Sequence, residues 1–176
     1  MKTFDDVYKT LPDAGWLNVD EARLLWRCCQ ETVGPILEVG CYKGRSTVLL
    51  AATNRIVHCV DPFDNFDDQL TGDQVEQKYF ANLNERGITN VVHWRSKVED
   101  WQPDYGTYGL CYLDGDHTYD GTLRQVETAL TLNASIIAIH DVNDEGGGVQ
   151  VKEAALRLLK RQWDERIDRM AVWRMK

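Results

Sequence analysis

The sequence has no long apolar run. Its 176 residues contain no stretch close to the roughly 20 apolar residues that a membrane-spanning helix needs, so no spanning helix is expected. The first residues, from Met1 to Asp6, do not follow the basic and then apolar order of a secretory signal. The five cysteines include no C-x-x-C pair, so neither a disulfide framework nor a zinc site is indicated. A reducing, cytoplasmic location is therefore expected.

A basic excess is also lacking. The formal net charge is -8 at pH 7, which argues against non-specific binding to nucleic-acid phosphates and favours a protein without a nucleic-acid or membrane partner. No repeat, low-complexity tract or Pro/Gly-rich linker divides the chain. We predict a single domain over residues 1–176, with a helical lead-in over 1–33 and a core over 34–176.

Short apolar runs alternate with helical periodicity, which predicts an α/β fold. Strands are expected over residues 35–40, 56–61, 90–94, 108–114, 135–140 and 170–175, the last paired with residues near Ile167. Helices are expected over residues 46–52 and 74–85, after Tyr119, around Val151, and after Asn18, which can form a capping box with Glu21. This alternation predicts a Rossmann-like, doubly wound sheet that is mostly parallel and binds ligands at the carboxyl ends of its strands.

Two glycines and two acids mark the predicted cofactor half of the site. Gly40 and Gly44 let the backbone turn tightly after the first strand and approach a ligand closely. Their spacing differs from the G-x-G-x-x-G of dinucleotide sites, and Glu38 suits a ligand that carries an amine. Asp61 ends the second strand, where an acid can accept both hydroxyls of a ribose. Further candidates are Tyr42, Ser46, Pro62, Phe63 on a purine face, and Ser96 with Lys97 at an adenine edge.

Four motifs follow one another in the order of a known family. They are the E-x-G-x-x-x-G-x-S turn, the V-D-P-F after the second strand, the D-G-D-H-T-Y block over residues 114–119, and His140-Asp141 with Gly148-Val149 beyond. The chain thus resembles a class I S-adenosylmethionine-dependent methyltransferase. It is most similar to the small family that shares a D-G-D-H-[ST]-Y motif with some sugar and macrolide O-methyltransferases. The resemblance covers nearly the whole chain and departs at residues 132–135, where relatives have a Pro-Gly-Gly turn.

The resemblance implies both a fold and an activity. The fold would have about seven strands, with an antiparallel last strand. S-adenosylmethionine would donate a methyl group to a hydroxyl of a small molecule or glycan. His117 would be the general base, because imidazole titrates near neutrality, and Asp114 would join it in catalysis and in cofactor binding. No separate cap domain is indicated, so a homo-oligomer is expected to complete the acceptor site.

A metal ion is a further expectation at this site. Asp114 and Asp141 are predicted to end neighbouring strands, where they could hold Mg²⁺ or another divalent ion together with His140. Similar metal-dependent methyltransferases have an acid at the position of His140, and imidazole is a poor magnesium ligand. His140 could instead contact the acceptor. Gly146 begins a loop that could close over the acceptor, and the acidic stretch over residues 64–73 is either a lid or a solvated loop.

Two other functions stay open at this point. One is a nicotinamide-dependent oxidoreductase on a similar fold, against which the glycine spacing and Glu38 both argue. The other is a non-catalytic module that binds the cofactor. If the chain is the methyltransferase, replacement of His117 or Asp114 should abolish turnover, whereas in a non-catalytic module the same replacement should change nothing measurable.

Overall fold

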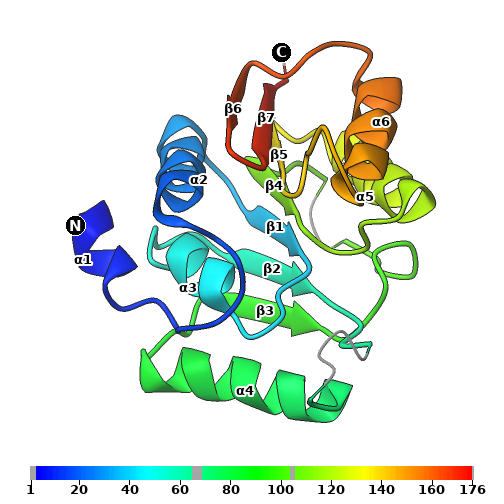
Figure 1. Ribbon diagram of the computed structural model, residues 1–176. Coiled ribbons are helices and arrows are strands. Elements are labelled where there is room, and N and C mark those ends of the chain that lie inside the picture. Colours follow the sequence, from blue (N-terminus) through cyan, green and yellow to red (C-terminus); the bar gives the residue numbers. More distant parts are fainter. Residues whose placement is uncertain (1–2, 65–68, 104–105, 176) are drawn as a thin grey trace.

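The computed structural model describes residues 3–64, 69–103 and 106–175. Across these residues, seven strands form one sheet in the order β3-β2-β1-β4-β5-β7-β6 (Figure 1). The strands are β1 (Ile36–Val39), β2 (Val57–Val60), β3 (Val91–Trp94), β4 (Leu110–Leu113), β5 (Ile136–Ile139), β6 (Glu165–Ile167) and β7 (Met170–Arg174). The first five are parallel, whereas β7 is antiparallel to both β5 and β6. The predicted Rossmann-like α/β sheet with a reversed last strand is confirmed.

Helices cover both faces of this sheet (Figure 1). They are α1 (Phe4–Tyr8), α2 (Val19–Glu31), α3 (Arg45–Ala51), α4 (Gly72–Glu85), α5 (Tyr119–Thr131) and α6 (Gly148–Leu159). Helices α1 to α4 share one hydrophobic cluster with the sheet, and α5 and α6 share a second cluster on the opposite face. Every residue of β1, β2, β4 and β5 is therefore buried, which explains why these strands are mostly apolar, with Glu38 and His58 as buried polar exceptions.

The beginning of α2 follows the sequence prediction. The side chain of Asn18 accepts hydrogen bonds from the backbone amides of Asp20 and Glu21, and the Glu21 carboxylate accepts one from the Asn18 amide. This is the expected capping box. Helix α1 was not predicted, because its five residues are too few to show helical periodicity. It has its own capping box, formed by Thr3 and Asp6.

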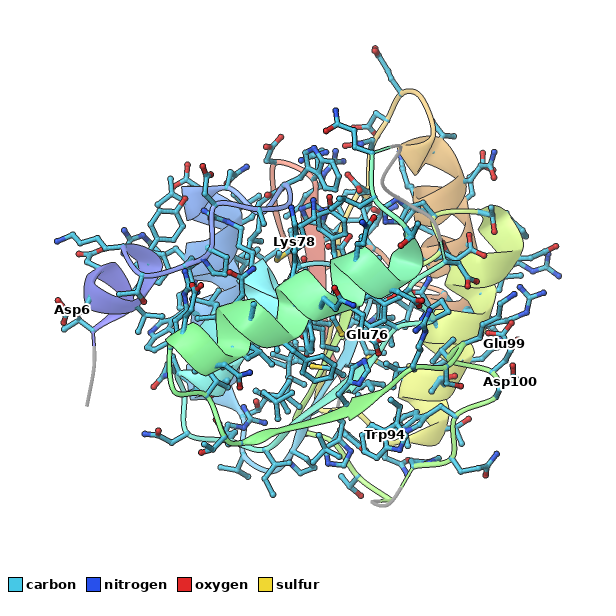
Figure 2. The ribbon with its side chains drawn as sticks, turned by 90° about the horizontal axis from the view of Figure 1, so that it is seen from below. Asp6, Glu76, Lys78, Trp94, Glu99 and Asp100 are labelled. Carbon is cyan, nitrogen blue, oxygen red and sulfur yellow. The ribbon has the colours of Figure 1, made fainter. Side chains whose placement is uncertain are left out.

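Helix α4 lies lengthwise beside β3 at one edge of the sheet, as the view from below shows (Figure 2). Arg95, which follows β3, lies 2.7 Å from a carboxylate oxygen of Asp73 and 2.9 Å from one of Glu76. These contacts join the first turn of α4 to the strand end beside the ligand-binding edge. Asp67 and Asp68, in the acidic stretch that was considered as a lid, lie outside the described residues.

No helix in the described residues has both the length and the apolar content needed to cross a membrane.

Candidate active site

A cavity of about 700 Å³ opens at the carboxyl ends of the central strands, the edge at which sheets of this kind bind ligands. Its volume is within the range of small-molecule sites, roughly 300–1,000 Å³. The predicted site residues that line it are Gly40, Tyr42, Ser46, Asp61, Pro62, Phe63, Lys97, Asp114, His117, His140 and Asp141. Three predicted cofactor residues, Glu38, Gly44 and Ser96, are not part of its lining.

Gly40 brings the ends of β1 and β4 together. Its φ angle is 85°, a conformation that L side chains rarely adopt. A Cβ atom at this position would lie 2.2 Å from the carbonyl oxygen of Asp114, which no real contact permits. The turn after β1 can therefore approach the loop after β4 only because residue 40 is glycine. Gly44, with φ 86°, directly precedes α3.

Asp61 holds this turn in place. One of its carboxylate oxygens accepts hydrogen bonds from the amides of Cys41 at 2.7 Å and Tyr42 at 2.9 Å. The other oxygen accepts one from the amide of Phe63 at 2.7 Å. The acid at the end of β2 thus organises both loops on the side of the cavity that is predicted to hold the cofactor. Its contact with a ribose stays a prediction.

Glu38 lies beneath the turn, completely buried. Its carboxylate accepts hydrogen bonds from the Thr47 hydroxyl at 2.6 Å and from the Cys59 thiol at 3.1 Å. Burial raises the pKa of Glu38 to about 7, although these hydrogen bonds oppose the shift. In this structure Glu38 supports the glycine turn from below, and its contact with an amine stays a prediction.

At the far end of the cavity, Phe63 is anchored in the core. Its ring centroid is 5.8 Å from that of Tyr79 and 5.4 Å from that of His93. Lys97 lines the cavity nearby, whereas the hydroxyl of Ser96 donates to the carbonyl of Lys97. The predicted purine position therefore has a fixed aromatic residue at its wall.

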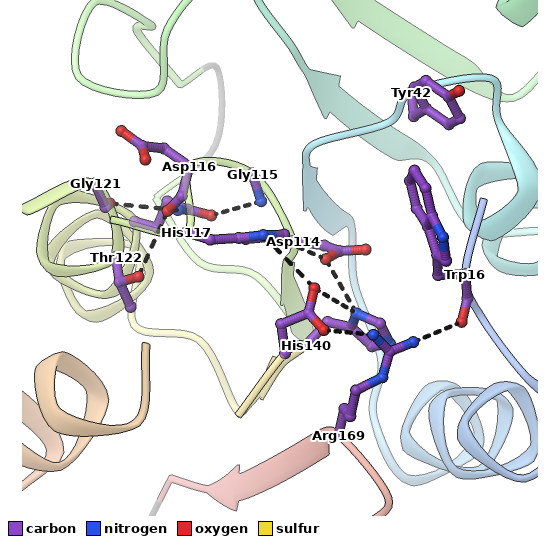
Figure 3. Close-up of polar contacts among 12 residues, drawn as sticks. Trp16, Tyr42, Asp114, Gly115, Asp116, His117, Gly121, Thr122, His140 and Arg169 are labelled. Carbon is purple, nitrogen blue, oxygen red and sulfur yellow. Dashed lines mark hydrogen bonds and ion pairs between the residues drawn. The ribbon is translucent and has the colours of Figure 1, made fainter. Parts of the chain in front are cut away.

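The block over residues 114–119, which follows β4, is held by hydrogen bonds to the side chain of Gln125 in α5. The side chain of Gln125 in α5 accepts from the amide of Gly115 and donates to the carbonyl of Asp116 (Figure 3). Thr118 caps α5 by accepting from the amide of Gly121. A fixed loop and a capped helix therefore present His117 to the cavity, where about a third of its side chain is exposed.

Asp114 is at the centre of the polar cluster in Figure 3. Its Oδ1 lies 3.2 Å from Nδ1 of His140 and 3.4 Å from Nε2 of His117, and its Oδ2 accepts a hydrogen bond from the Tyr112 hydroxyl at 3.0 Å. Burial alone would raise the pKa of Asp114, but the two histidines outweigh it and hold the pKa well below its usual range. Asp114 is therefore an anion at neutral pH. Its hydrogen bond raises the pKa of His117, against the opposing effect of burial.

His140 joins this cluster to the N-terminal helix. Its Nε2 lies 3.2 Å from a carboxylate oxygen of Glu21, and both side chains are almost completely buried. Burial alone would lower the pKa of His140, but its carboxylate partners, led by Asp114, raise it to about 12. His140 therefore carries a positive charge at neutral pH. Glu21 was not predicted as a site residue, because its place in the capping box already accounted for an acid there.

Arg169 is the second unpredicted member of the cluster. It lies in the turn between β6 and β7, and its Nη1 is 2.9 Å from Oδ1 of Asp141. Its Nη2 donates to the backbone carbonyl of Trp16 at 3.3 Å. The Trp16 ring stacks on Tyr42 with 5.6 Å between centroids, so an aromatic pair borders the cavity near the cluster (Figure 3). No motif indicated Arg169, since 28 residues separate it from Asp141 in the sequence.

The donor set does not fit a magnesium ion. Asp114, His140 and Asp141 can bring one ligand atom each within 4.8 Å of one another. However, magnesium prefers oxygen ligands in octahedral geometry, and one of these three groups is an imidazole. Its Nδ1 already faces both carboxylates, at 3.2 Å and 3.5 Å, and Asp141 is paired with Arg169. Cationic side chains of the protein thus neutralise the carboxylates that an ion would need.

The sequence matches the model of a known protein family. A family model described as a methyltransferase domain matches residues 37–142, more than half of the chain. The match begins in β1 and ends directly after Asp141, so it spans the glycine turn, Asp61 and the block after β4. No curated protein matches the chain in sequence.

Solved structures of low sequence identity share the fold. The O-methyltransferase TomG from Streptomyces achromogenes, involved in tomaymycin synthesis and solved in complex with SAM, is 17% identical with a TM-score of 0.64, and the match covers 90% of this chain and 78% of that one. An O-methyltransferase from Bacillus cereus in complex with SAH is 14% identical with a TM-score of 0.62, covering 90% and 79%. CalS11, a TDP-rhamnose 3'-O-methyltransferase of calicheamicin biosynthesis, is 19% identical with a TM-score of 0.61, covering 90% and 81%.

Proposed function

This chain belongs to the methyltransferase-domain family, and from that membership we propose that it transfers a methyl group from S-adenosylmethionine to a hydroxyl of a small-molecule or glycan acceptor. One observation carries the proposal. A single cavity contains both the glycine turn braced by Asp61 and the pair formed by His117 and Asp114. The same cavity can thus hold a cofactor beside a base.

The cofactor side of the cavity fits an adenosyl amino acid. Gly40 keeps the turn free of a side chain, and Asp61 presents a carboxylate at the cavity wall. We propose that these residues hold the cofactor together with Tyr42, Ser46, Pro62, Phe63 and Lys97, all of which line the cavity. Glu38, Gly44 and Ser96 would act by shaping the loops. When bound, S-adenosylmethionine supplies an electrophilic methyl group on a positively charged sulfur.

His117 would remove the proton of the acceptor hydroxyl. Its Nε2 faces Asp114, which suits a tautomer with the hydrogen on Nε2, and its Nδ1, which lies 3.6 Å from Oδ2 of Asp141, would accept the proton. The proton of the acceptor hydroxyl would pass to Nδ1 of His117, and its oxygen would take the methyl group that bound S-adenosylmethionine would supply, with S-adenosylhomocysteine as the other product. Asp114 then stabilises the imidazolium. A general base of this kind contributes about 10²- to 10⁴-fold to the rate.

A sugar-like acceptor is supported by two observations. The block over residues 114–119 is similar to that of sugar and macrolide O-methyltransferases, and one structural neighbour is a TDP-rhamnose 3'-O-methyltransferase. The acceptor would lie on the side of the cavity where Trp16 stacks on Tyr42. No step of this mechanism requires a metal ion.

Calorimetry tests the cofactor first. We expect S-adenosylhomocysteine to bind with a stoichiometry near one and NAD to give no heat of binding. If NAD binds and S-adenosylhomocysteine does not, the proposal is wrong and the oxidoreductase is favoured.

An acceptor screen with labelled S-adenosylmethionine tests the reaction. Nucleoside-diphosphate sugars and phenols are the first acceptors to try. We expect His117→Asn to lose turnover by about 10²- to 10⁴-fold while it keeps its affinity for S-adenosylhomocysteine. Equal turnover in the variant and the wild type would remove His117 as the base. If no acceptor is methylated although the cofactor binds, the non-catalytic module is favoured.

A further inference from the structure

We infer that Arg169 is a built-in cation that serves Asp141 and the bound acceptor in place of a divalent metal ion, so that this chain works without a metal. The inference deepens the proposed function and rests on it. It starts from the contact between Nη1 of Arg169 and Oδ1 of Asp141 at 2.9 Å, beside the cavity that His117 also lines.

The backbone of Arg169 is fixed on both sides. Its amide donates a hydrogen bond to the buried carboxylate of Glu21 at 3.1 Å, and its carbonyl accepts one from the amide of Val142 at 2.8 Å. Arg169 lies in the turn between two paired strands, and β7 pairs with β5, which ends just before Asp141. The pairing of β5, β6 and β7 therefore positions the guanidinium next to the cluster.

The guanidinium spans the cluster and the cavity mouth. One terminal nitrogen contacts Asp141 and the other donates to the carbonyl of Trp16 at 3.3 Å (Figure 3). About a third of the side chain is exposed, and it lines the cavity. Within the described residues its Nε makes no hydrogen bond. A donor thus stays available for an acceptor oxygen, and guanidinium is charged at every physiological pH.

A divalent ion at Asp114 and Asp141 would meet this cation directly. Asp141 offers Oδ1 to Arg169, while its Oδ2 lies 3.5 Å from Nδ1 of His140. An ion bound there would have to displace the guanidinium or lie close to it, because both would contact the Asp141 carboxylate. Two positive charges that share one carboxylate repel each other strongly in a partly buried site. Arg169 therefore both neutralises the carboxylate and excludes the ion.

Binding of Mn²⁺, followed by electron paramagnetic resonance in the presence of S-adenosylhomocysteine, tests this inference. We expect Arg169→Ala to bind Mn²⁺ at least about tenfold more tightly than the wild type, a change equal to about 1.4 kcal/mol, and the wild type to bind no more Mn²⁺ than its Asp141→Asn variant. Arg169→Lys, which keeps a positive charge, should again exclude the ion. Asp141→Asn in the Arg169→Ala background should abolish the gained site.

Arg166→Ala is the matched control. Arg166 is in the same hairpin but pairs with Asp144 at 3.0 Å and does not line the cavity, so its loss should leave Mn²⁺ binding at the wild-type level. Wild-type binding of Mn²⁺ that Asp141→Asn abolishes would overturn the inference. The same comparison of wild type with Asp141→Asn decides the matter if Arg169→Ala does not fold.

The metal titration does not depend on methyl transfer. Failure of the protein to bind S-adenosylhomocysteine would count against the proposed function, whereas a specific Mn²⁺ site in the wild type would count against the role of Arg169 alone. Once an acceptor is known, turnover in excess chelator gives a second reading, and we expect it to equal turnover in untreated buffer.

Discussion

Glu21 lies 3.2 Å from Nε2 of His140, although 119 residues separate them in the sequence. The same carboxylate accepts hydrogen bonds from the amides of Asn18 and Arg169. The acid that closes the capping box of α2 is therefore also a buried partner of the polar cluster around Asp114. Helix α2 and the β6–β7 hairpin are held to the cluster through one side chain.

Replacement of Glu21 by Gln separates these two roles. Gln can still close a capping box, but it leaves the buried imidazolium of His140 with one carboxylate fewer. We expect the free energy of unfolding at pH 7 to fall by about 1–3 kcal/mol, the usual cost of a buried polar group that loses its partner. Urea denaturation measures the change. Asp20→Asn, at an exposed position of the same helix turn, should change stability far less, and an equal loss in both variants would contradict the charge role.

The charged state of His140 predicts how stability depends on pH. Because its pKa is raised to about 12 in the folded protein, the folded state keeps a proton that the unfolded state releases near pH 6.5. This contribution is fully present below pH 6.5 and is lost as the pH rises toward 12. We expect the free energy of unfolding to fall with a slope of up to about 1.4 kcal/mol per pH unit between pH 7 and 8.

Denaturation curves at several pH values measure this slope. His140→Gln removes the titrating group and should flatten it in the same interval. A slope equal to that of the wild type would show that His140 is neutral in the folded protein.

Gly40 allows a direct test of the cofactor side. Gly40→Ala places a Cβ 2.2 Å from the carbonyl oxygen of Asp114 and forces a side chain into a positive φ. We expect the affinity for S-adenosylhomocysteine, measured by calorimetry, to fall at least about tenfold, or about 1.4 kcal/mol, because the turn must move away from β4. Gly87→Ala is the control, since Gly87 also has a positive φ but nothing lies within 4 Å of its Cβ position. It should cost stability without loss of affinity.

The strands themselves and the chemistry at their ends were predictable for a local reason. Buried strands are short apolar runs, and the residues that follow them, such as Asp61, Asp114 and Asp141, stand at one sheet edge whatever the loops do. The capping box of Asn18 was equally local. Each of these signals lies within a few residues of the feature that it predicts.

The rest of the site depends on contacts between distant segments. Arg169 reaches Asp141 only because β7 reverses beside β5, and no periodicity encodes which turn residue of a hairpin faces the cavity. Glu38 combines both cases. Its position next to the glycine turn is evident from the sequence, but its burial depends on contacts with other segments. Whether a residue before a turn lines a cavity or lies beneath it is decided by the packing of α3 on the sheet, here by Thr47.

A pH profile of the reaction tests the pairing of His117 with Asp114. The hydrogen bond to Asp114 raises the pKa of His117 above its usual value near 6.5, and a general base works only in its neutral form. We therefore expect kcat/KM to rise with pH through an inflection above 6.5, because this ratio reports the free enzyme. Asp114→Asn removes the negative charge and should move the inflection to lower pH while it also lowers the maximum rate. An inflection at the same pH in the variant and the wild type would assign the titration to the acceptor hydroxyl instead of His117.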